Sequence, residues 1–111
     1  MTDVLLTTQD NIQEQKIVKT IGLVYGNTVR SRNVANNMIA GFRSIFGGEL
    51  VEFTKAVAES REQALNRLKA RAIELGADAI VCIRLITTEV GSTSSEVLAY
   101  GTAVKLAPLN S

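Results

Sequence analysis

The stretch ADAIVCIRLITTEVGSTSSEVLAYGTAVKL, residues 77–106, decides the fold. Its first part, residues 77–90, is a continuous apolar run that is too rich in β-branched residues for a helix. The segment GSTSS at 91–95 contains residues typical of turns, and residues 96–106 again have the composition of a strand. The two segments together predict a β-hairpin.

The chain before this hairpin predicts two further strands and two helices. Glycine is expected just beyond a helix C-terminus, and it follows both helices. The order β–β–α–α–β–β indicates an α+β fold, with a mainly antiparallel sheet packed on two helices. The expected elements are strands at 4–8 and 17–30, a helix starting at Ser31 or Asn33 and ending near 46, and a helix from about Phe53 to Leu75.

Two of the strands place a tyrosine directly before a glycine, at Tyr25–Gly26 and Tyr100–Gly101. Consecutive side chains point to opposite faces of a strand, so each strand has one large face and one small face. Small faces let another backbone approach closely, and we expect this role for Gly22, Gly26 and Gly101. A phosphate-binding glycine would instead lie in a loop that opens a helix.

The segment 79–86 is apolar on both of its alternating faces, apart from Arg84. An antiparallel sheet with one face in water should carry polar residues on that face. Two helices can cover only one side of so small a sheet, and the sequence does not tell which side. We therefore expect another copy of the chain to cover the other side, as a homo-oligomer.

Composition limits the classes of protein that remain. The 111 residues are expected to form one domain, with a core at about 4–106 and a tail at 107–111. Twelve basic and eleven acidic residues give a net charge of +1, which argues against a nucleic-acid partner. No apolar run approaches the ~18–20 residues of a membrane span. The first ten residues do not resemble a signal peptide, so a soluble cytoplasmic protein is expected.

Chemistry-bearing residues are few, because the chain has no histidine and one cysteine. Cys82 is interpreted as a small buried hydrophobe or as a soft metal ligand. One thiolate per chain cannot build a tetrahedral zinc site, so only a symmetry axis could gather enough ligands. No catalytic constellation can be assembled, and neither an enzyme nor a cofactor is expected.

Two arginines are candidate ligand or interface residues. Arg61 falls by angle inside the apolar stripe of the second helix, where a charge is costly unless it is paired. Its partner could be a carboxylate within or between subunits, the side chain could reach water, or it could bind an anion. Arg84 would lie opposite Gly101 if the hairpin loop has an even number of residues. Otherwise it would lie opposite Tyr100, where a cation–π contact is possible.

Five segments, in order and spacing, resemble the YbjQ-like family of small bacterial and archaeal proteins, often labelled heavy-metal-binding. The resemblance covers residues 4–106 and implies a dodecin-like α+β subunit that forms a homopentamer, with short extra strands joining neighbours. It implies no established reaction. Arg84 stands where the family usually has an acidic residue, so no site is carried over to that strand. The segments are IGLVYGNTV, GGELVEF, SREQAL, ELGADAIV and AYGTAVKL.

The function expected from the sequence is that of an oligomeric structural or interaction protein. The alternative is a binding module that holds a small ligand or heavy metal at subunit interfaces. Tyr25 and Tyr100 join the two arginines as candidates for such a site. The sequence does not identify the ligand.

Overall fold

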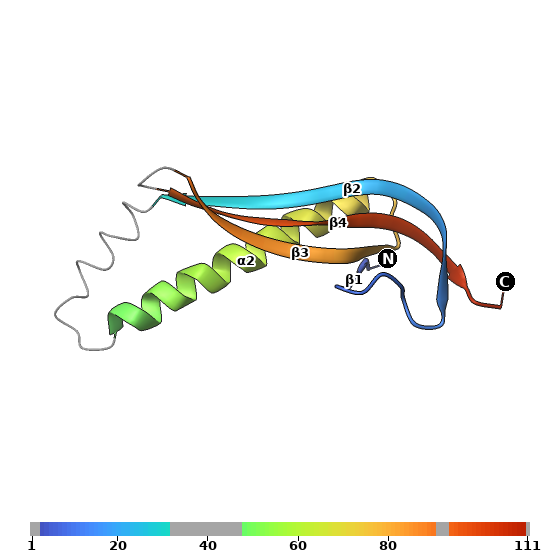
Figure 1. The fold of residues 1–111 in the computed structure, drawn as a ribbon, viewed down its shortest axis with the longest axis horizontal. Coiled ribbons are helices and arrows are strands. Elements are labelled where there is room, and N and C mark those ends of the chain that lie inside the picture. Colours follow the sequence, from blue (N-terminus) through green and yellow to red (C-terminus); the bar gives the residue numbers. More distant parts are fainter. Residues whose placement is uncertain (1–2, 32–47, 91–93, 111) are drawn as a thin grey trace.

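The computed structural model describes residues 3–31, 48–90 and 94–110 (Figure 1). The α+β class is confirmed. The first predicted helix falls mainly on residues 32–46, which lie outside the described residues, and the second begins earlier than Phe53. The described elements are β1 (Leu5–Leu6), β2 (Gln15–Ser31), α2 (Gly48–Glu74), β3 (Ala79–Val90) and β4 (Ser94–Pro108).

The four strands form one mixed sheet in the order β1-β3-β4-β2. The strand β4 pairs antiparallel with both β3 and β2, whereas β1 pairs parallel with β3. The predicted hairpin is confirmed, with Val90 opposite Ser94. β4 continues to Pro108, which is paired with Gln15, so residues 107 and 108 belong to the sheet and not to the expected tail.

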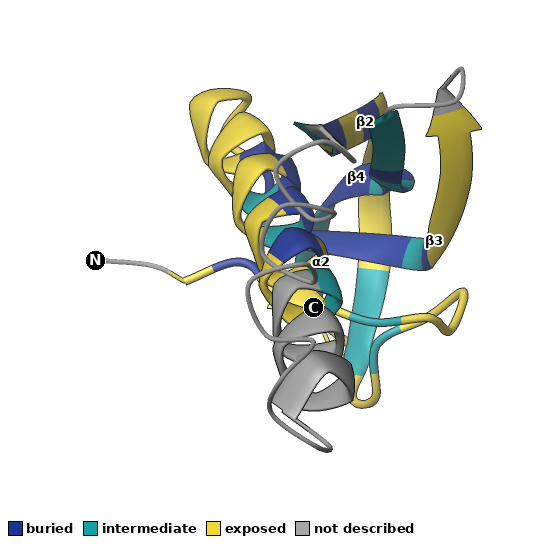
Figure 2. Ribbon diagram, turned by 90° about the vertical axis from the view of Figure 1, so that its left-hand side faces the viewer, coloured by how far each residue is buried: buried dark blue, intermediate teal, exposed yellow. Residues whose placement is uncertain are grey.

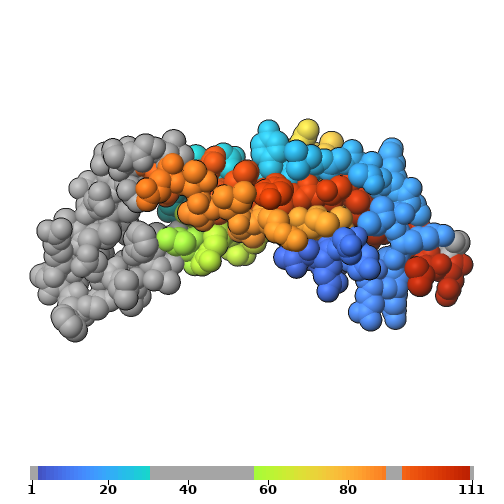
Figure 3. All heavy atoms as spheres, in the orientation of Figure 1, coloured from blue at the N-terminus to red at the C-terminus, as the bar shows by residue number. Residues whose placement is uncertain are grey.

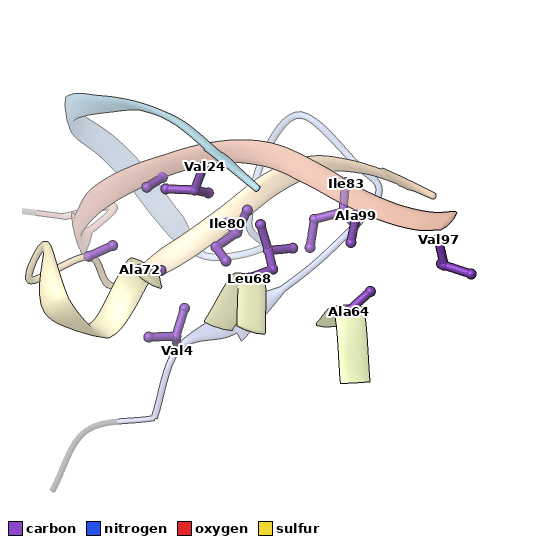
Figure 4. Packing of buried hydrophobic residues seen from close by; sticks show 11 residues of the cluster. Val4, Val24, Ala64, Leu68, Ala72, Ile80, Ile83, Val97 and Ala99 are labelled. Carbon is purple, nitrogen blue, oxygen red and sulfur yellow. The ribbon is translucent and has the colours of Figure 1, made fainter. Parts of the chain in front are cut away.

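The helix α2 packs on one face of the sheet only, as the side view in Figure 2 shows. Ala64, Leu68 and Ala72 of α2 are fully buried. They meet the small-residue face of β4, which resolves the question of which face takes the helix. Figure 4 shows Leu68 among Val24, Ile80 and Ile83 at the centre of this core. Burying a leucine of this size stabilises the fold by about 2 kcal/mol.

Gly76 ends α2 in the way the sequence predicts. Its φ of 75° is a left-handed conformation that glycine adopts without the steric cost of a Cβ. The Gly76 amide donates to the Ile73 carbonyl at 3.0 Å, and the Ala77 amide donates to the Ala72 carbonyl at 3.0 Å. These bonds satisfy carbonyls at the helix end and turn the chain into β3. Within the described residues, no helix is long and apolar enough to cross a bilayer.

A β-bulge in β3 corrects the alternation predicted for residues 79–86. The pairing with β4 shifts between Val81 and Arg84, and Cys82 has a φ of 57°. One extra residue therefore enters β3, and the phase of its side chains changes at that point. Ile80 and Ile83 both join the core under α2, although strict alternation would put them on opposite faces.

The N-terminal segment covers part of the second sheet face, which the sequence analysis assigned to another copy. Residues 5–9 run along the edge of β3; the amides of Cys82 and Ile83 donate to the carbonyls of Gln9 (2.8 Å) and Thr7 (3.1 Å). The chain then crosses the sheet, and Ile12 packs against a small second cluster formed by Ala79, Val81 and Val104. An intermolecular partner is therefore not needed at this end of the sheet.

Candidate interaction surface

Beyond that cluster, the sheet face opposite α2 is uncovered by any described residue. In Figure 3 the atoms of β2, β4 and β3 lie at the front, with α2 mostly behind them. Leu23, Tyr25 and Val29 are 70%, 62% and 56% exposed, and Ile86 of β3 is 44% exposed. We call this surface the open face. By strand alternation it includes Leu23, Tyr25, Asn27, Val29, Arg84, Ile86, Thr88, Glu96, Leu98, Tyr100 and Thr102.

Three predicted candidate residues form one row across the open face. Tyr25 lies opposite Tyr100, and Tyr100 lies opposite Arg84 on its other side. The structure thus selects the second of the two positions predicted for Arg84. Its guanidinium donates to the carbonyls of Thr8 (3.1 Å) and Ile83 (2.8 Å), so it ties the N-terminal segment to the bulge in β3.

Asn27 makes a polar contact on the open face. The sequence does not predict this contact. The side-chain Nδ2 of Asn27 donates to Oε2 of Glu96 at 3.0 Å, across the β2–β4 pair. The two residues are diagonal neighbours, because Asn27 faces Leu98 and Glu96 faces Val29. No periodic pattern in the sequence indicates such a diagonal pair, since it depends on the register of strands far apart in the chain.

Gly26 and Gly101 lie at close contacts, as their small-residue faces predicted. A Cβ at Gly26 would lie 2.4 Å from the Leu68 nitrogen, so β2 and α2 touch there through their backbones. A Cβ at Gly101 would lie 2.7 Å from a methyl carbon of Ile80. Gly22 has no such contact among the described residues of the single chain, where its Cβ would meet nothing within 4 Å. Gly22 is needed for its φ of 144°, next to an irregularity in β2.

Arg61 does not occupy the buried position predicted for it. The residue is exposed, whereas its neighbour Ser60 is 5% exposed. The buried line of α2 repeats every four residues through Ser60, Ala64 and Leu68, and it drifts slowly around the helix. Arg61 lies about 100° from Ser60 on the helix, so its side chain turns to solvent. The prediction for Arg61 assumed an apolar stripe at a constant angle on the helix, so it did not include this drift.

Cys82 is half-buried and packs beside the second cluster, at the strained position of the bulge. Its thiol is one soft donor, which leaves a tetrahedral metal site incomplete. In residues 3–31, 48–90 and 94–110 there is no group of three or more Cys, Asp, Glu or His side chains that could hold a metal ion. A thiolate site gathered by symmetry stays a prediction.

Asp78 joins the turn after α2 to the end of β4, and sequence reasoning did not single it out. Its Oδ2 accepts from the Leu106 amide at 2.8 Å, and its own amide donates to the Val104 carbonyl at 2.9 Å. Lys105 lies 3.6 Å from Oδ1 and also donates to the Gly76 carbonyl. The available signal was a carboxylate two residues after the helix-ending glycine and directly before a strand.

These features define a two-layer α+β domain, with one sheet face under a helix and part of the other uncovered by any described residue. The chain belongs to the YbjQ family, whose model carries the description "Putative heavy-metal-binding" and matches residues 4–107. A UPF0145 protein of Methanococcus vannielii is 50% identical over 102 residues, covering 92% of this chain and 97% of the relative. One of Archaeoglobus fulgidus is 39% identical over 104 residues, covering 94% and 96%.

A solved structure shares the fold. The crystal structure of a DUF74-family protein of unknown function from Pediococcus pentosaceus superposes with a TM-score of 0.62. The match covers 94% of this chain and 98% of the other, at 18% sequence identity. At that identity the comparison supports the arrangement of helix and sheet and says nothing about activity.

Proposed function

We propose that this chain is the subunit of a cytoplasmic homo-oligomer with a structural or interaction role and no catalytic activity. The open face carries this proposal. Three of its large apolar side chains, Leu23, Tyr25 and Val29, are more than half exposed in the single chain. Contiguous apolar surface of this kind on a folded protein marks a contact with another molecule.

The two edges of the sheet support the proposal that this other molecule is a second copy of the chain. β2 has β4 on one side and no described strand on the other, and no described strand pairs with the outer edge of β3 from Arg84 to Val90. Unpaired strand edges present rows of backbone donors and acceptors that pair with another strand. Since the two edges lie on opposite sides of one sheet, head-to-tail pairing gives a ring if the rotation closes. The number five rests on the family resemblance alone.

Size-exclusion chromatography with light scattering tests the proposal at micromolar concentration. One chain weighs 12.0 kDa, so a pentamer would weigh about 60 kDa (five times 12.0). Leu23→Glu should dissociate the assembly, because a carboxylate on the open face would lose its hydration at the contact. Ile73→Glu is the matched control, since Ile73 is an exposed apolar residue on α2. A folded 12 kDa wild-type species would refute the proposal.

A second candidate is a binding module at the subunit interfaces. The row of Tyr25, Tyr100 and Arg84 favours it, because it combines aromatic rings with a cation on the open face. The family description suggests a heavy metal as the ligand. Calorimetric titration of the assembly with divalent metals, and separately with common anionic metabolites, distinguishes this module from a purely structural ring. Saturable heat at one site per subunit or per ring would favour it.

A further inference from the structure

The strand β2 is irregular before Gly22. Its pairing with β4 is irregular between Ile17 and Lys19 and again between Thr20 and Gly22. Bulges of this kind bend and twist an edge, which disturbs pairing with another chain. From Gly22 onward the register with β4 is continuous to Ser31. A strand of a neighbouring molecule can therefore form regular backbone hydrogen bonds with β2 only from Gly22 onward.

Farther along the same edge of β2, a side chain from α2 binds a backbone carbonyl. Gly26 lets the helix backbone touch β2, and Arg67 lies at this contact. Nη1 of Arg67 donates to the Asn27 carbonyl at 2.5 Å. In an edge strand, alternate residues turn their N–H and C=O away from the sheet, so a carbonyl reached from the helix lies on the outer side. The acceptor that an added strand would use at Asn27 is thus already bound.

We propose that Arg67 ends the intersubunit strand pairing along β2, so that a strand of a second copy pairs over Gly22–Gly26 and stops at Asn27. This inference rests on the homo-oligomer proposed above. Leu23 and Tyr25, the two most exposed apolar residues of β2, lie inside the stretch. Asn27 is fixed on both sides, by Arg67 at its carbonyl and by Glu96 at its side chain. Arg67 is a positioning residue that sets how far two subunits overlap.

Amide hydrogen exchange on the wild-type assembly tests the limits of the pairing without any variant. The amides of Leu23 and Tyr25 should exchange slower by about tenfold or more than the amide of Val29. Equal protection at all three positions in an assembly would overturn the inference, as would equally fast exchange. A wild-type monomer would refute the proposed function itself, and its mass of 12.0 kDa distinguishes that outcome.

Arg67→Met tests the role of the guanidinium, since it keeps an apolar stem and removes every donor. Protection should then spread to Val29, or the scattering mass should rise above that of the wild-type assembly as longer pairing admits further copies. Arg71→Met is the matched control, because Arg71 is exposed one turn later on α2 and bonds only Glu74 among the described residues. Unchanged exchange and mass in a folded Arg67→Met protein would overturn the inference.

Discussion

Gly26→Ala should be costly, because one added methyl group has no space between β2 and α2. Its Cβ would lie 2.4 Å from the Leu68 nitrogen, 2.5 Å from the Ala64 oxygen and 2.9 Å from the Arg67 carbonyl carbon. All three atoms belong to the helix backbone, so no side chain can rotate away. Ordinary contact begins at 3.4 Å, and α2 would have to retreat by about 1 Å (3.4 minus 2.4).

The displacement of α2 determines how much Gly26→Ala destabilises the fold. A radial gap of 0.5–1 Å already loses about a quarter to a half of the dispersion energy of each contact. Overpacking costs about 1–3 kcal/mol, and a rigid backbone puts this site at the upper end. Alanine restricts the unfolded chain and returns about 0.5 kcal/mol. We expect a net loss of about 2–3 kcal/mol, or about 10 °C in melting temperature for a domain of this size.

Thermal and urea unfolding by circular dichroism, at one fixed subunit concentration, measures this loss. Gly76→Ala is the control for conformation alone, because its φ is 75° and its Cβ would meet no atom of the described residues within 4 Å. It should cost about 1–2 kcal/mol. Gly101→Ala should be milder than Gly26→Ala, since its Cβ would meet only one backbone atom closer than 3.0 Å, the Val81 oxygen at 2.9 Å. A Gly26→Ala midpoint equal to that of wild type would refute the backbone contact.

Three further predictions concern a turn, a surface ion pair and the thiol. Asp78→Ala should destabilise the fold by about 1–3 kcal/mol in urea unfolding, because it leaves the half-buried Leu106 amide without its acceptor, whereas Asp78→Asn should keep most of this bond. The hydrogen bond and charge of Lys69, at 2.6 Å, lower the pKa of Asp3 below its ordinary value. The stability from this pair should therefore be present above the ordinary aspartate pKa of about 3.9 and be lost as pH falls through the lowered value. Lys69→Met should raise the pKa of Asp3 in an NMR titration, and an unmoved pKa would contradict the pairing. Tight zinc or copper binding in calorimetry should be absent, and binding that survives Cys82→Ser would require a carboxylate site absent from the described residues.

Much of the fold follows from local patterns in the sequence. The hairpin of β3 and β4, the end of α2 at Gly76 and the small face under the helix each depend on residues within one element or on the turn beside it. The bulge at Cys82 could not be predicted in this way. The bulged amides are bound by carbonyls of the N-terminal segment, at Thr7 and Gln9, which come from a distant part of the chain.

The open face was predictable only in outline. Apolar residues on both sides of 79–86 indicated a second covered face, but the part around Val81 is covered by Ile12 of the same chain. The row of Tyr25, Tyr100 and Arg84 depends on strand registers that no single segment encodes. No sequence pattern singles out Arg67, because its contact with Asn27 exists only where Gly26 brings the helix against the strand.

The central position of β4 also constrains when the protein can fold. β2 pairs with β4 from Gln15↔Pro108 to Ser31↔Ser94. β2 is synthesised early, but it can pair only after β4 has been synthesised. Pairings so distant in sequence have a high contact order, which slows folding. While the chain is still being translated, Leu23 and Tyr25 have no strand beside them, and such exposed apolar strands are prone to aggregate. The sheet is therefore completed only when β4 has left the ribosome, and a chain that stops before residue 94 would leave β2 without its native partner.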